Sequence, residues 1–184
     1  MQGLGSLMGN LAAGFRLITC LPVRGEMFVT RTDQLILLLV LAMAIQLGGA
    51  AIPAWPIAGV WAYGLGVMML KFTAILACLQ GFAWMLGDWR KAGGLQVMVL
   101  SGGVNAELAW LILANSIDWR VLPPYAGFLI PNSFLGFLAI ATLRGLRMQF
   151  GLPWVWSALL GALLAVILLA LGLKLGGVPL YQSG

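Results

Sequence analysis

Lys71 and Glu107 are the two charged residues that interrupt the long apolar stretches of this sequence. A carboxylate beside an ammonium group can bind and release a proton, or it can hold two helices in register. If the apolar stretches lie in lipid, each charge at the bilayer centre costs roughly 2.5–3.5 kcal/mol and needs a compensating partner. These two residues are therefore the first candidates for a specific site.

The spacing of the two residues predicts that they meet. Lys71 lies seventeen positions before Asp88, and Glu107 lies sixteen positions after Lys91. Two antiparallel helices that leave the same loop would carry the two side chains at depths that agree to within about one turn. We therefore expect an intramembrane polar pair. Asn105 lies about 200° around the helix from Glu107 and needs a different partner.

Three interpretations of this pair are open. In the first, the pair fixes the register of its two helices, as buried polar groups in membrane helices often do. In the second, it belongs to a polar pathway for a proton or a small solute, with Glu107 as the titrating group and Lys71 as its counter-charge. In the third, Lys71 extends outward to the headgroups, which requires that the second span effectively begins near Val67.

Pro131 and Asn132 form a second notable spot, where we expect a helix kink. A proline inside a helix lacks the N–H that would bond the carbonyl oxygen of Gly127. Broken helices line the binding sites of transporters, but single proline kinks also occur in ordinary membrane bundles. The sequence shows no inverted repeat, so we interpret this spot as structural.

The residue types argue against an enzyme. The chain has no histidine, and its five carboxylates are dispersed, which removes the usual general base and most catalytic zinc sites. Cys20 and Cys78 indicate neither a disulfide framework nor a metal motif. The paired glycines lack the strand and the Lys-Ser of a phosphate loop. We expect no catalytic residue, no metal ligand and no cofactor.

Composition indicates an all-α, polytopic transmembrane helical bundle. Of the 184 residues 62% are hydrophobic and 8% are charged, and the mean hydropathy is +1.03. The net charge is +5, but the basic residues are scattered over segment ends, so we discount nucleic acid as a partner. The expected partner is the lipid bilayer.

About 20 apolar residues cross the hydrocarbon core, and this length predicts five spans. Residues 1–34 form a cytoplasmic leader, and residues 35–184 form the transmembrane domain. The expected spans are 35–52, 57–86, 95–116, 125–143 and 154–173. Prolines and glycines mark the breaks between them, namely Pro53, Pro56, Gly87, Pro123, Pro124, Gly151 and Pro153.

The distribution of lysine and arginine predicts the orientation, because these residues resist translocation. Seven of them fall on one side of a five-span chain: Arg16, Arg24, Arg31, Arg90, Lys91, Arg144 and Arg147. Four tryptophans, Trp84, Trp89, Trp154 and Trp156, fall on the same side. We expect a cytoplasmic N-terminus and a C-terminus on the opposite side, in the inner membrane if the protein is bacterial.

The leader carries an apolar pattern with the period of a helix. Its members are Leu4, Leu7, Met8, Leu11, Phe15 and Ile18. This pattern predicts an amphipathic interfacial helix. It can lie on the cytoplasmic leaflet with Arg16 near anionic headgroups, or its apolar face can pack against the cytoplasmic ends of the bundle.

The leader, with Pro22 and Phe28 before the first of five spans, resembles the Yip-domain family of membrane proteins. The resemblance implies a five-span fold. Some members of that family are linked to small GTPases and vesicle traffic, and many bacterial members are uncharacterised. We therefore expect a non-enzymatic interaction, assembly or trafficking factor that associates with other membrane proteins or with copies of itself. The alternative is a small-solute or proton transporter or channel component that uses Lys71 and Glu107.

Overall fold

A computed structural model describes residues 2–54, 58–116 and 126–175, and these residues form an all-helical bundle without strands. The α-helices are α1 (Gln2–Ile18), α2 (Thr32–Ala54), α3 (Ala58–Met85), α4 (Ala92–Ser116), α5 (Ala126–Phe150) and α6 (Trp154–Leu175). Two single helical turns, η1 (Gly25–Met27) and η2 (Trp89–Lys91), lie in the connections. The predicted all-α class is confirmed.

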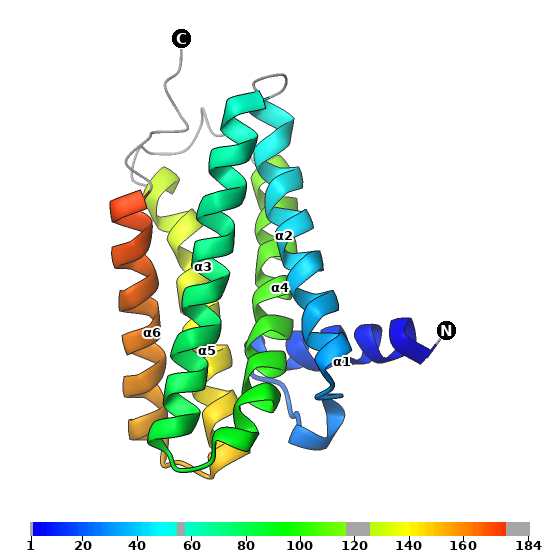
Figure 1. Cartoon of the computed structure of the whole chain (residues 1–184), viewed down its shortest axis with the longest axis vertical. Coiled ribbons are helices and arrows are strands. Elements are labelled where there is room, and N and C mark those ends of the chain that lie inside the picture. Colours follow the sequence, from blue (N-terminus) through cyan, green and yellow to red (C-terminus); the bar gives the residue numbers. More distant parts are fainter. Residues whose placement is uncertain (1, 55–57, 117–125, 176–184) are drawn as a thin grey trace.

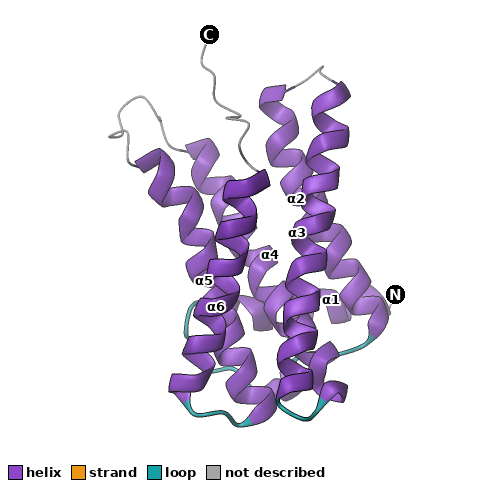
Figure 2. Cartoon of the chain, turned by 60° about the vertical axis from the view of Figure 1, so that its left-hand side comes forward, coloured by secondary structure: helices purple, strands orange, loops and turns teal. Residues whose placement is uncertain are grey.

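Helices α2 to α6 stand side by side, and α1 lies across them near one end (Figure 1). The short connections between α3 and α4 and between α5 and α6 lie at this same end, as the turned view in Figure 2 also shows. Helix α4 is central, because it packs against α1, α2, α3 and α5. A site on α4 can therefore receive side chains from several neighbours.

The predicted apolar ranges lie in helices α2 to α6, apart from Leu86, which follows the end of α3, and from residues 57 and 125, which the structure does not describe. Helix α5 departs most from its range, because it continues from residue 143 through Arg144 and Arg147 to Phe150. Gly151 has φ +65°, which ends this helix, and Gly87 with φ +81° follows α3 in the same way. Backbone geometry, and not the loss of hydrophobicity, sets these ends.

The prediction of five membrane spans was compared with the length and hydropathy of the described helices. Among the described residues, one helical stretch, Trp89–Leu113, is apolar and long enough by composition and length to cross a bilayer. Three apolar stretches are shorter: Thr32–Gln46, Met69–Met85 and Trp154–Ile167. The five predicted spans therefore lack support from this criterion, partly because the ends of α2 and α6 and the start of α3 carry side chains outside the described set.

Each helix contributes fully buried apolar side chains to one core. Examples are Leu17, Leu38, Leu79, Met98, Leu138 and Leu164. Helices of this bundle approach closely where glycines face a neighbour. A Cβ atom on Gly14 of α1 would lie 2.6 Å from the carbonyl oxygen of Ser101 on α4, so only glycine permits this crossing.

Helix α1 packs one flank against the bundle, which is one of the two arrangements expected for the leader. Ala13, Leu17 and Ile18 are buried in the core of the bundle, whereas Leu4 and Met8 remain 69% and 65% exposed. The buried flank is rotated from the apolar face that the sequence pattern predicted. The reason is that the close approach at Gly14 and polar contacts of the helix, not hydrophobicity alone, orient it.

Candidate polar site within the bundle

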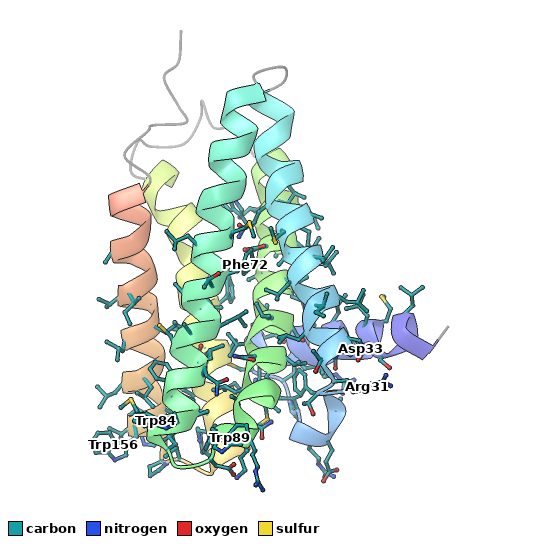
Figure 3. The ribbon with its side chains drawn as sticks, in the orientation of Figure 1. Arg31, Asp33, Phe72, Trp84, Trp89 and Trp156 are labelled. Atoms are coloured by element: carbon teal, nitrogen blue, oxygen red, sulfur yellow. The ribbon has the colours of Figure 1, made fainter. Side chains whose placement is uncertain are left out.

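Lys71 and Glu107 lie near the middle of neighbouring helices. Helix α3 has 28 residues and α4 has 25, and the short connection around η2 makes them antiparallel. Figure 3 places Phe72, the residue next to Lys71, in the middle part of the bundle, far from Trp84 and Trp89 at one end. The two charges are therefore held at matching depths by the lengths of their helices.

The structure brings Lys71 and Glu107 together. The Nζ atom of Lys71 lies 3.4 Å from Oε1 of Glu107, which makes both an ion pair and a hydrogen bond. The Glu107 side chain is 6% exposed and the Lys71 side chain 29%. Lys71 also lies over the ring of Phe72, 5.7 Å from its centroid. The ammonium group is thus directed into the bundle.

Gln46 of α2 completes the cluster, and sequence reasoning missed it. Its Nε2 atom donates a hydrogen bond to the same oxygen of Glu107 that contacts Lys71. The available signal was that Gln46 is the single polar side chain in the range 35–52. We call Gln46, Lys71 and Glu107 the polar cluster. It joins α2, α3 and α4 at one carboxylate oxygen.

The second carboxylate oxygen of Glu107, Oε2, is buried and has no hydrogen-bond partner among the described residues. A buried acceptor without a donor is unusual in proteins, because it loses its bonds to water without replacement. This oxygen can therefore take a proton or accept a hydrogen bond from another donor. The geometry of the site is compatible with both roles.

Asn105 has the separate partner that its position on α4 required. Its Nδ2 atom donates to the carbonyl oxygens of Leu11 on α1 and Ser101 on α4, both at 2.8 Å. Asn105 therefore fastens α1 across α4. It is not part of the polar cluster.

A second buried polar group, which the sequence did not reveal, fixes the leader. Asn10 is fully buried and exchanges two hydrogen bonds with the backbone of Val29, at 2.7 and 3.2 Å. Gln34 of α2 is also buried, and its amide donates to the carbonyl oxygen of Gly3 at 3.2 Å. These bonds satisfy the backbone of the connection between α1 and α2. Their role is structural.

Arg144, one of the basic residues counted for the membrane orientation, also binds the backbone of α1 and of the residues after it. Its guanidinium group donates to the carbonyl oxygens of Arg16, Leu17 and Leu21, at 3.0, 2.7 and 2.8 Å. The last carbonyls of a helix lack partners within it and carry a partial negative charge, so an arginine there is favourable. Arg144 thus caps α1 from α5.

Pro131 and Asn132 lie within α5, which is helical from Ala126 to Phe150. Their side chains are outside the part of the chain that the structure describes. The kink expected at this spot remains a prediction.

No group of three or more histidine, cysteine, aspartate or glutamate side chains that could hold a metal is found among the described residues. Cys20, which is exposed, and Cys78, which is half-buried, are both free thiols.

Comparison with known proteins does not assign the chain to a family. No family model, no curated protein and no solved structure matches this chain. The resemblance to the Yip-domain family, drawn from Pro22, Phe28 and the predicted spans, therefore stays a prediction.

Proposed function

We propose that this chain is an integral membrane protein in which α2 to α6 cross the bilayer and whose role is that of a non-enzymatic interaction or assembly factor. In this proposal α1 lies at the cytoplasmic interface and the N-terminus is cytoplasmic. Its partners are other membrane proteins or further copies of the chain, as the Yip-domain resemblance suggests.

Helix length supports the membrane placement. Helices α2 to α6 have between 22 and 28 residues, and 22 residues extend over about 33 Å, slightly more than a hydrocarbon core. Their outer flanks carry exposed apolar side chains, among them Ile36, Val40, Met69, Ile112, Leu159, Leu163 and Val166. Such an apolar surface suits lipid and would be a liability in water.

Tryptophans at one end of the bundle support the same placement. Trp84, Trp89 and Trp156 lie at the end that holds the short connections (Figure 3). Together with Trp154 they are more than half exposed. Indole rings favour the headgroup level of a membrane, where one part of the ring is wet and the rest is apolar. This end is therefore assigned to one membrane surface, the cytoplasmic one by the count of lysine and arginine.

The observation that supports the proposed role is that the groups of the polar cluster bind one another. Lys71 and Gln46 both direct their donors to one oxygen of Glu107, so the ionic groups inside the bundle bind one another across three helices. Such a cluster sets helix register. The surfaces that remain for recognition are then the outer helix faces.

Mild detergent extraction followed by copurification tests the interaction role. We expect the chain to elute in a complex, and we expect deletion of the chain to impair the assembly of the partner found in it. A chain that elutes as a monomer and whose deletion changes no assembly would contradict the proposal.

A second candidate function, a proton or small-solute conductor, is favoured by the free Oε2 atom of Glu107. Flux into liposomes discriminates the two functions. In a conductor, Glu107→Gln should abolish flux while the chain remains folded, and Lys71→Ala should change its rate. If the cluster only packs helices, neither substitution changes flux and both lower the thermal stability of the protein.

A further inference from the structure

Three chain segments converge at the end of the bundle that carries the tryptophans. Gly94, near the start of α4, leaves room that is occupied by Thr30 from the connection before α2 and by Gln149 from the end of α5. Lys91 of η2 lies over the ring of Phe150, 5.6 Å from its centroid. The basic residues of these segments therefore belong to one surface.

This surface has an excess of positive charge. Seven basic residues lie on its segments and the adjoining end of α1, against three acidic ones, Glu26, Asp33 and Asp88, which leaves an excess of four. The field above such a surface attracts anions from solution or from a membrane.

Three of the seven basic side chains form ion pairs or hydrogen bonds with other residues of the protein. Arg31 pairs with Asp33 at 3.1 Å, and Lys91 pairs with Asp88 at 3.2 Å. Arg144 caps the carbonyl oxygens at the end of α1. The oxygens of the protein that these three groups contact compete with an external anion.

The other four are exposed arginines without an acidic partner among the described residues: Arg16, Arg24, Arg90 and Arg147. Arg90 lies over the ring of Trp89, 5.9 Å from its centroid, which joins a free guanidinium group to an indole of the headgroup level. We call these four residues the free arginines. Guanidinium groups bind the oxygens of a phosphodiester with two parallel hydrogen bonds.

We propose that this end of the bundle selectively binds the headgroups of anionic phospholipids through the free arginines. The inference rests on the proposed membrane placement, which brings the tryptophans and therefore the arginines to the level of lipid phosphates. Zwitterionic lipids offer the same phosphate with a cation attached, so the excess positive charge selects lipids with a net negative headgroup. The surface thus recruits anionic lipid around the end of α1, the two helical turns η1 and η2, and the end of α5.

The test uses the full chain reconstituted into phosphatidylcholine bilayers with traces of spin-labelled phosphatidylglycerol or spin-labelled phosphatidylcholine. Electron spin resonance measures the fraction of each label that the protein immobilises. We expect several-fold stronger association of phosphatidylglycerol and a decline of this preference as salt is raised, because exposed charges are screened. This readout on the unaltered chain needs no variant to fold.

Paired variants test the residue assignment at equal net charge. Arg24→Gln with Arg147→Gln removes two free arginines, and Arg31→Gln with Lys91→Gln removes two that are already paired. Each free arginine that is lost should lower the association of the anionic lipid by up to about fivefold. The second variant should retain most of the preference. Equal losses in both variants would overturn the assignment.

Other outcomes distinguish this inference from the membrane placement. Immobilised lipid with equal fractions of both labels would overturn the anionic-lipid proposal alone, and the absence of any immobilised lipid would overturn the membrane placement as well.

Discussion

At the scale of single residues, one carboxylate oxygen joins three helices. Oε1 of Glu107 accepts hydrogen bonds from Lys71 and Gln46, while its companion oxygen Oε2 has no partner among the described residues. The cost of burying Glu107 is thus offset on one side only. Removal of Glu107 would leave a buried ammonium group without its counter-charge, and removal of Gln46 would take away one neutral donor.

Gln46→Leu should lower the free energy of unfolding by about 1–2 kcal/mol, because one hydrogen bond to a buried carboxylate is lost. Denaturant unfolding in detergent micelles measures the change. Gln80→Leu is the matched control, because Gln80 lies exposed on α3 and should leave stability within about 0.5 kcal/mol of the unaltered chain. Two equally stable variants would show that Gln46 does not support the cluster.

The sequence predicted the depth of these residues but not their full set of partners. Counting from Asp88 and Lys91 placed Lys71 and Glu107 at matching levels, because the rise of a helix per residue is constant. Gln46 reaches the same point from α2, whose rotation and tilt depend on packing with α4. No local pattern encodes that rotation. The contact of Asn10 with Val29 was hidden for the same reason.

At the scale of elements, contacts of side chains with backbone fasten α1 to the bundle in addition to its buried apolar residues. Arg144 caps its last carbonyls, Asn105 binds the carbonyl of Leu11, and Gly14 allows contact with Ser101. The sequence predicted an amphipathic helix here correctly. It predicted the orientation of that helix only in part, because glycine and asparagine in the contact carry no hydrophobic signal.

Gly14→Ala should weaken the crossing of α1 over α4. The new methyl group would lie 2.6 Å from a backbone oxygen of Ser101, and overpacking of this kind costs about 1–3 kcal/mol. Gly9→Ala is the control, because a Cβ atom there meets nothing within 4 Å and alanine favours a helix by up to about 1 kcal/mol.

Thermal unfolding and hydrogen exchange of residues 2–18 measure both changes. We expect faster exchange in α1 for the Gly14 variant and unchanged or slower exchange for the Gly9 variant. Equal exchange rates in the two variants would contradict the close crossing.

At the scale of the whole molecule, the residue types change along the axis of the bundle. Exposed tryptophans and basic residues lie at one end, apolar helix flanks follow, and the polar cluster lies midway. The all-α bundle was predictable from composition and apolar run lengths. The five predicted spans lack support, because one stretch among the described residues meets the span criterion.

Site-specific labelling in membrane vesicles tests the membrane placement most directly. In a chain with Cys20→Ser and Cys78→Ser, single cysteines replace Glu26, Arg90 or Pro153, one from each connection at the tryptophan end. An impermeant maleimide should label all three from the cytoplasmic face only, and the chain should stay in the membrane after an alkaline carbonate wash. Labelling of these positions from opposite faces, or release of the chain by the wash, would contradict the account.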